Sequence, residues 1–139
     1  MRIKQQVEKL MRKHETDCPY KIANRLGIHI SFEHLGNTLG YYSRHFRIKI
    51  IHINQDLNEN QKKFFVAAHE LGHAIRHAEY NTQFLKKSTF FSTSPLEKEA
   101  NTFAIELLFH DGRDSSVTIR DAIREYGVPE NLALLKSLK

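Results

Sequence analysis

The chain has 139 residues, of which 40% are hydrophobic and 27% are charged, a balance typical of one soluble globular domain. No segment approaches the roughly 18 apolar residues of a membrane span, and residues 1–10 lack the apolar core of a secretory signal. The single cysteine, Cys18, excludes an internal disulfide. We therefore expect a cytoplasmic protein without membrane contact. The net charge of +5 permits weak attraction to acidic partners, but the basic residues are scattered, so we do not expect direct DNA binding.

Three short segments in the first half of the chain alternate between apolar and polar residues. This alternation predicts β-strands over residues 28–33, 38–44 and 47–53, with a turn at residues 36–37 before the second strand. Because the connections are brief, we expect the strands to form a small antiparallel sheet. An edge strand of such a sheet can hold an extended peptide by backbone hydrogen bonds.

The next segment predicts an amphipathic helix. Residues 61 to about 79 contain no proline, and apolar residues recur there at spacings of three and four. Residues 56–60 offer N-cap candidates and early acidic side chains, which suit a helix start. Gly72 costs about 1 kcal/mol relative to alanine in a helix interior, so we expect another element to pack closely against it.

This helix carries the motif His69-Glu70-Leu71-Gly72-His73. Histidines four residues apart lie on the same helix face, offset by roughly 40°, and can reach one Zn²⁺ at about 2.0–2.1 Å. Glu70 follows the first histidine, and in this H-E-x-x-H pattern its carboxylate acts on a metal-bound water without binding the metal. The motif is typical of zinc-dependent hydrolysis of peptide bonds. The alternative is a buried helix that carries two surface histidines.

A second helix is predicted over residues 94–109, with Ser94 as N-cap and a proline at the first position. A catalytic zinc has three protein ligands and an open position, and this helix is the expected source of the third ligand. Its apolar residues form one stripe, which is bordered by Glu97 and Asn101. Spacing favours Glu97 as the ligand, with Asn101 hydrogen bonding to a ligand histidine.

Other interpretations of these carboxylates remain open at the level of sequence. Glu99 competes with Glu97 and points about 200° around the helix from it, and Glu106 lies later on the same helix. Ser94-x-x-Glu97 also matches a capping box, in which Glu97 would only bond back to the N-cap amide.

The last part of the chain, residues 113–139, predicts two helices over 118–126 and 129–138. Their outline resembles a helix-turn-helix, but the second helix begins with an acidic residue and continues with apolar ones, which disfavours contact with DNA. We expect this pair to pack as an extension on a domain formed by residues 1–112. The predicted fold class is therefore α+β, with a small sheet packed on helices and a C-terminal helical pair.

The two helix motifs together resemble the ImmA/IrrE family of metallo-endopeptidases. Its members show an H-E-L-G-H helix followed by an E-x-E-A-N/D-x-F-A helix, and these letters occur here at residues 69–73 and 97–104. The resemblance covers about residues 15–110. It implies a zincin-like minimal metalloprotease domain with a gluzincin-type site.

The resemblance also implies ligands and a substrate. In similar sites the first Glu of E-x-x-x-N/D is the third zinc ligand, which corresponds to Glu97 with Asn101 in the supporting position, although Glu99 also matches the family pattern. Family members commonly act in the cytoplasm on a helix-turn-helix repressor of a phage or mobile element, and cleavage derepresses transcription. The implied partner is therefore a protein substrate of that kind.

The expected mechanism uses Zn²⁺ held by His69, His73 and Glu97, with a water in the fourth position whose pKa falls toward ~7. Glu70 takes the proton of this water and returns it to the leaving amine. A donor for the oxyanion is also expected, and the sequence leaves four candidates: Tyr41, Tyr42, Tyr80 and His77. The alternative function is a non-cleaving zincin-fold module that binds a repressor or DNA.

Overall fold

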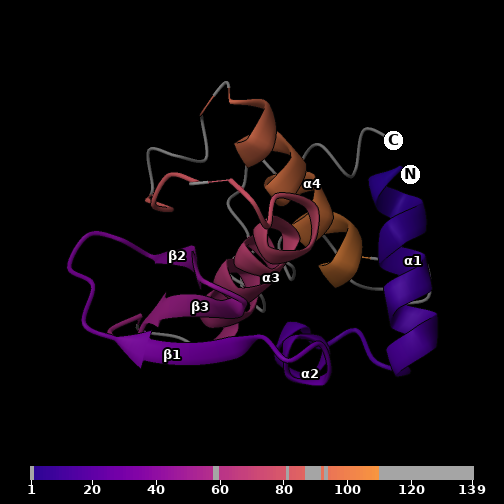
Figure 1. The fold of residues 1–139 in the computed structure, drawn as a ribbon, viewed down its shortest axis with the longest axis horizontal. Coiled ribbons are helices and arrows are strands. Elements are labelled where there is room, and N and C mark those ends of the chain that lie inside the picture. Colours follow the sequence, from indigo (N-terminus) through magenta and orange to yellow (C-terminus); the bar gives the residue numbers. More distant parts are fainter. Residues whose placement is uncertain (1, 58–59, 81, 87–91, 93, 110–139) are drawn as a thin grey trace.

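The computed structural model describes residues 2–57, 60–80, 82–86, 92 and 94–109 (Figure 1). The elements in chain order are α1 (Ile3–His14), α2 (Pro19–Arg25), β1 (His29–Glu33), β2 (Gly40–His45), β3 (Ile48–Asn54), α3 (Asn60–Arg76) and α4 (Pro95–Leu108). The predicted helices over 118–126 and 129–138, and with them the predicted domain boundary after residue 112, lie outside the described residues. The predicted α+β class is confirmed.

The three strands form one mixed sheet in the order β1-β3-β2. β2 pairs antiparallel with β3, where Tyr42 lies opposite Ile51, whereas β1 pairs parallel with β3, where Ile30 lies opposite Ile51. The prediction of an antiparallel sheet is therefore wrong for the β1–β3 pair. The reason is topological: residues 34–39 carry the chain past the place beside β1, and the β2–β3 hairpin then folds back and inserts β3 there.

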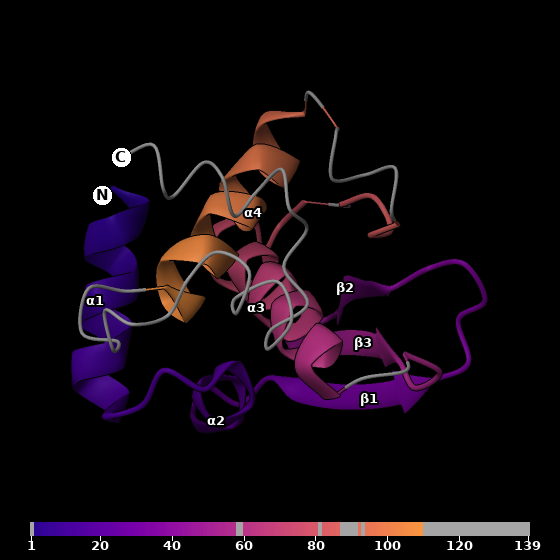
Figure 2. The same cartoon turned by 180° about the vertical axis from the view of Figure 1, so that it is seen from behind.

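The core lies between the sheet and the helices. Along β3, Ile51 and Ile53 are buried, while Ile50 and His52, which alternate with them, are half-buried, as expected for a strand with one face on the core. Figures 1 and 2 show α3 crossing behind the sheet, with α4 beside it and α1 on the outer side of α4. Three residues of α3 that are almost completely buried belong to this core: Phe65, Ala68 and Leu71.

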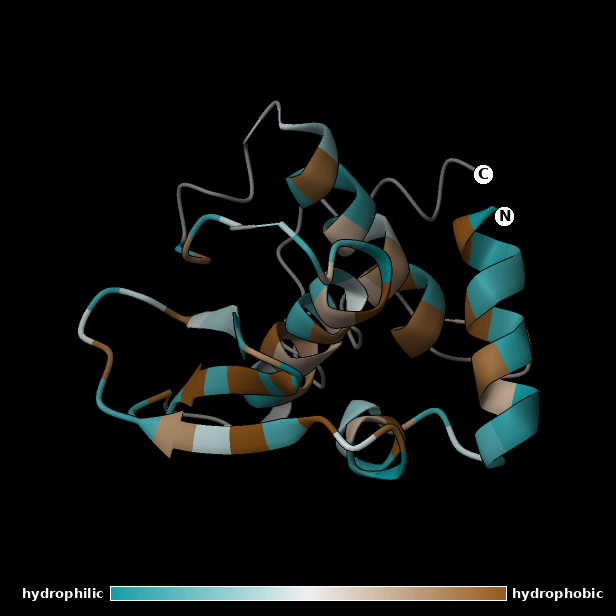
Figure 3. Ribbon diagram, viewed as in Figure 1, coloured by the Kyte–Doolittle hydropathy of each residue, from teal (hydrophilic) through white to brown (hydrophobic). Residues whose placement is uncertain are grey.

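The amphipathic pattern of the helices explains how they pack. In Figure 3, hydrophobic and hydrophilic residues alternate along α1, and Val7, a buried residue of this helix, belongs to the main core. A helix with one apolar stripe buries that stripe and leaves its polar face outward. Among the described residues, no helix is long and apolar enough to cross a membrane.

α3 and α4 approach each other closely at Gly72. A Cβ atom at this position would lie 3.0 Å from Phe103 Cβ and 3.1 Å from Phe103 Cγ, closer than ordinary van der Waals contact, so Phe103 would have to give way by a few tenths of an ångström. The prediction of a close neighbour at Gly72 is confirmed. This contact is what allows polar side chains of α4 to reach the histidine-bearing face of α3.

Candidate metal centre

α3 brings the two motif histidines and the intervening glutamate into one buried cluster. His69, Glu70 and His73 each have 0% of their surface exposed, and one ligand atom of each lies within 4.8 Å of the others. The helix is continuous from Asn60 to Arg76, so the predicted one-turn spacing is present, and the two imidazole centroids are 4.9 Å apart. The helix ends at Arg76, earlier than the predicted end near residue 79.

Glu97 reaches this cluster from α4. Its Oε1 lies 3.1 Å from His69 Nε2, and its Oε2 lies 2.9 Å from His73 Nε2, with the carboxylate almost completely buried. Burial by itself would raise the pKa of Glu97, but the proximity of the two imidazoles outweighs it and lowers the pKa to about 2. An ionised carboxylate therefore faces both Nε2 atoms, as a metal ligand must.

Several buried polar atoms at this point have no hydrogen-bond partner among the described residues: both carboxylate oxygens of Glu70, Nε2 of His73 and Oε2 of Glu97. His73 Nε2 and Glu97 Oε2 are only 2.9 Å apart, yet their orientation does not make them a hydrogen-bonded pair. Buried polar atoms are nearly always paired, so this cluster calls for a further partner. Two imidazole nitrogens and a carboxylate that face a common point fit a divalent cation.

His69 is oriented by Asn101 of α4. Its Nδ1–H donates to Asn101 Oδ1 over 2.9 Å, because an amide oxygen can only accept. A proton on Nδ1 leaves the lone pair of Nε2 available to a metal. The supporting role expected of Asn101 thus corresponds to a contact that the structure contains.

Burial lowers the pKa of His73 despite the opposing effect of Glu97, which favours the neutral imidazole that binds metals. On its other side, His73 Nδ1 lies 2.9 Å from His77 Nδ1, and His77 Nε2 lies 2.8 Å from Glu99 Oε1. The sequence did not predict this contact, for which the spacing of His73 and His77 on one helix face was the available signal.

The two competing carboxylates therefore occupy different positions. Glu99 accepts from His77 and from Arg76 Nε, the latter over 3.2 Å, and its side chain is 40% exposed. The hydrogen bond from His77, followed by the contact with Arg76, lowers the pKa of Glu99. These distances favour Glu97 over Glu99 as the ligand.

The capping-box interpretation of Glu97 does not hold in this structure. Ser94 is the N-cap of α4 but makes no side-chain cap hydrogen bond, and its backbone N–H donates to Ser92 Oγ over 3.1 Å. The carboxylate of Glu97 is instead directed at the two imidazoles. Glu97 therefore contacts the histidine cluster instead of capping the N-terminus of α4.

Glu70 is suited to hold a proton. Burial, followed by the charge of Glu97, raises the pKa of Glu70 well above its usual value, and a raised pKa strengthens a carboxylate as a general base near neutral pH. Its Cγ lies 3.7 Å from the position that a Cβ on Gly40 would take. The first residue of β2 thus lies directly beside this glutamate.

The four candidates for oxyanion stabilisation differ in the contacts and exposure of their side chains. Tyr42 donates its hydroxyl proton to the Ala78 carbonyl over 3.1 Å, and His77 lies between His73 and Glu99. The ring of Tyr41 stacks on His52 with centroids 4.0 Å apart, and Tyr80 is 60% exposed. Because Tyr41 follows Gly40, whose Cβ position faces Glu70, the Tyr41 side chain lies on the opposite face of β2. Tyr80, whose ring is 6.5 Å from that of His77, remains as the better candidate.

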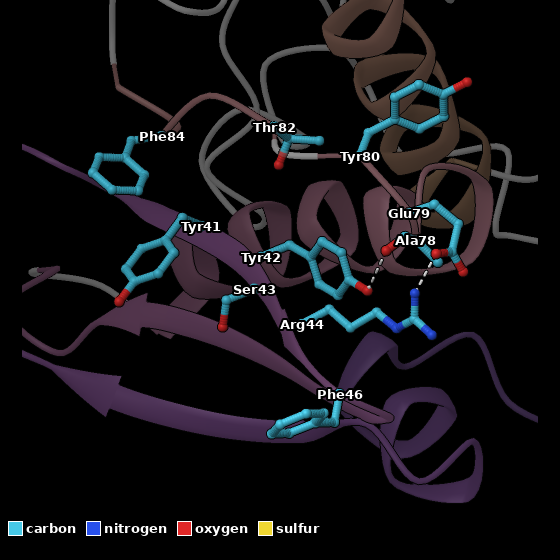
Figure 4. A pocket seen from close by; sticks show the side chains of 10 residues that line it. All are labelled: Tyr41, Tyr42, Ser43, Arg44, Phe46, Ala78, Glu79, Tyr80, Thr82 and Phe84. Atoms are coloured by element: carbon cyan, nitrogen blue, oxygen red, sulfur yellow. Dashed lines mark hydrogen bonds and ion pairs between the residues drawn. The ribbon is translucent and has the colours of Figure 1, made fainter.

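All three tyrosines line a cavity of about 490 Å³. Figure 4 shows it between β2 on one side and residues 78–80, 82 and 84 on the other, with the Arg44–Glu79 ion pair at one end. Tyr41 and Phe84 pack together at the opposite end, with centroids 4.7 Å apart. The cavity thus combines aromatic walls with one charged pair.

A small α+β domain with a helix-borne histidine pair and a carboxylate from a neighbouring helix defines the class of minimal metallopeptidase domains. The sequence pattern of the peptidase M78 family, described as the IrrE N-terminal-like domain, matches residues 23–134. The chain belongs to this family, the ImmA/IrrE family, and the resemblance noted from the two motifs is confirmed. A metallopeptidase family implies a metal ion, and the buried group of His69, Glu70 and His73 could bind one.

Two relatives illustrate the membership. The chain is 40% identical over 142 residues to "Uncharacterized immunity region protein 2" of Bacillus phage phi105, an alignment that covers 98% of this chain and 89% of that protein. It is 34% identical over 111 residues to "Metallopeptidase ImmA" of Bacillus subtilis (strain 168), which covers 78% of this chain and 64% of that protein.

Proposed function

We propose that the chain is a zinc-dependent endopeptidase. The observation that carries this proposal is the group of buried, unpaired polar atoms on Glu70, His73 and Glu97, which a divalent cation would satisfy. Two imidazoles and one carboxylate are a ligand set typical of catalytic zinc, whereas magnesium and calcium prefer oxygen ligands alone. His69, His73 and Glu97 would hold the ion.

A bound zinc ion supplies a Lewis acid and lowers the pKa of a water molecule that it binds. The residues of the chain do the rest. Glu70 accepts the proton of the attacking water and returns it to the leaving amine, in keeping with its burial and raised pKa. Tyr80 would donate a hydrogen bond to the oxyanion.

The substrate would bind along β2. This strand is at one edge of the sheet, and an edge strand can pair with an extended peptide. Leu85 already forms an antiparallel bridge with Gly40, so the part of β2 proposed for pairing is the part that borders the cavity. Substrate side chains would then enter a space lined by aromatic residues, among them Tyr41 and Phe84.

We infer that the substrate is a helix-turn-helix repressor of a phage or mobile element, and that its cleavage derepresses transcription in the cytoplasm. Support comes from the family and from the relative named for a phage immunity region. Residues 1–112 would form the metallopeptidase domain, with residues 113–139 as a helical extension packed on it.

The decisive experiment compares the purified full chain with two variants on a candidate repressor. Glu70→Gln should keep one zinc per chain and lose cleavage, because the amide cannot accept the water's proton. His69→Ala should lose both zinc and cleavage. Normal cleavage by Glu70→Gln would show that the assigned base is wrong. An intact repressor with every variant, including the wild type, would favour the non-cleaving binder instead.

A further inference from the structure

A line of hydrogen-bonded side chains leads from the candidate metal centre toward the surface. His73 Nδ1 lies 2.9 Å from His77 Nδ1, and His77 Nε2 lies 2.8 Å from Glu99 Oε1. His73 and His77 are almost completely buried, with 0% and 3% of their surfaces exposed, while Glu99 is at the partly exposed end. The line therefore connects a ligand position to a carboxylate on α4.

The chemistry of the three groups allows one direction of proton donation when His73 binds a metal through Nε2. The proton of His73 must then be on Nδ1, so His73 donates and His77 Nδ1 accepts. A neutral His77 carries its own proton on Nε2, and this N–H donates to Glu99, whose carboxylate only accepts. Each link requires the next one, and Glu99 fixes the direction of the whole line.

His69, the other histidine of the motif, is oriented by a single hydrogen bond, because its Nδ1–H donates directly to Asn101 Oδ1 over 2.9 Å. Both histidines are thereby turned so that Nε2 faces Glu97. We propose that His77 is a positioning residue for the metal centre, which holds the ring orientation and tautomer of His73, and that Glu99 holds His77. This inference rests on the proposed role of His73 as a ligand.

The outer end of the line is itself held in place. Arg76 Nε donates to Glu99 Oε1 over 3.2 Å, and an Arg76 terminal nitrogen donates to Gln6 Oε1 of α1 over 2.7 Å. Glu99 Oε1 therefore has two donors, and it cannot turn away from His77 without breaking the contact with Arg76. Three helices thus cooperate in orienting one imidazole.

The test is zinc affinity, measured by competition with a chromogenic chelator at fixed pH. Loss of a partner that orients a ligand typically weakens metal binding about 10–100-fold, and we expect this range for His77→Leu. His77→Asn places an amide oxygen near the former position of Nδ1 and should restore most of the affinity. Glu99→Ala should weaken binding less than His77→Leu does, because His77 keeps its packing.

A matched control is His14→Leu, since His14 is also a buried histidine but has no part in the centre. It should bind zinc as the wild type does. Melting temperatures with and without zinc separate positioning from general stability: a purely structural His77 would lower both equally, whereas a positioning His77 would reduce the rise that zinc produces. Imidazole ¹⁵N spectra of the zinc-loaded protein should show His73 protonated at Nδ1.

The outcomes distinguish this inference from the proposed function. If His73→Ala abolishes zinc binding while His77→Leu and Glu99→Ala bind as tightly as the wild type, the positioning role is refuted and the ligand set stands. If His73→Ala binds zinc with wild-type affinity, the ligand set itself is wrong. If His77→Leu does not fold, Glu99→Ala and His77→Asn decide: wild-type affinity in Glu99→Ala together with an unprotonated His73 Nδ1 in His77→Asn would overturn the proposal.

Discussion

Replacing Gly72 with alanine tests whether the spacing between α3 and α4 controls the metal centre. Alanine gains about 1 kcal/mol over glycine in a helix interior. Its Cβ, however, would lie 3.0, 3.1 and 3.2 Å from three atoms of Phe103, where carbon atoms prefer about 3.5–4.0 Å. Relief of this overlap requires α4 to move by roughly 0.5 Å, and overpacking of this kind costs about 1–3 kcal/mol.

The displacement matters more for the metal than for the fold. The gain in helix propensity offsets only part of the overpacking cost, so we expect Gly72→Ala to be destabilised by no more than about 2 kcal/mol in urea unfolding. Metal–ligand distances, in contrast, tolerate only about 0.2 Å, and α4 carries Glu97. We therefore expect zinc binding, measured by chelator competition, to weaken at least about tenfold.

The opposite result would refute this reasoning. If Gly72→Ala is stabilised by about 1 kcal/mol, as helix propensity alone dictates, and binds zinc unchanged, the two helices do not meet at this residue. A double variant with Phe103→Ala supplies the control, because it removes Cγ and Cδ1 of Phe103, two of the three atoms that the new methyl group would crowd. Its zinc affinity should recover partly toward that of Phe103→Ala alone.

Three further outcomes follow from the site and the sheet. Glu97→Gln should weaken zinc binding, measured by calorimetry, more than the roughly 100-fold typical of a lost orienting partner, whereas Glu99→Gln should change it less than tenfold; the reverse order would exchange their roles. Chelation should lower the melting temperature, since zinc at 100 times its Kd contributes about 2.7 kcal/mol; an unchanged melting curve would argue against a bound metal. The hydrogen bond from His52 lowers the pKa of Glu33 below 4.5, so its stabilisation is present above the unfolded pKa and is lost as pH falls through the folded value. Glu33→Gln should therefore flatten the acid limb of the urea-unfolding profile, only slightly because the carboxylate is 36% exposed, and an identical profile would contradict the pairing.

The strands show what sequence can and cannot predict about the fold. Alternation between apolar and polar residues located all three strands within two residues of their ends. It did not reveal that β3 lies between the other two, because alternation reports which face of a strand is buried and carries no information on its neighbours. Brief connections favoured an antiparallel sheet, yet residues 34–39 suffice to carry the chain to the far edge.

The candidate metal centre also has features that could be predicted from sequence and features that could not. The His69 and His73 pair could be predicted because its geometry is contained within one helix turn. Spacing favoured Glu97 over Glu99 without deciding between them, since both fit the motif and only the face that α4 turns toward α3 separates them. That face depends on the contact between Gly72 and Phe103, which are far apart in the sequence, so local patterns do not predict it. The partnership of His77 with Glu99 was hidden for the same reason.

The hydrogen bond between Gln6 and Arg76 extends the influence of the N-terminal helix further than its position suggests. α1 precedes the family match, which begins at residue 23, so a trimmed protein that starts there would retain both helix motifs, at residues 69–73 and 97–104. It would nevertheless lose the brace on Arg76 and the buried Val7. We expect such a truncation to leave α3 and α4 less rigidly aligned, because both the contact with Gln6 and the packing of α1 on the core are lost.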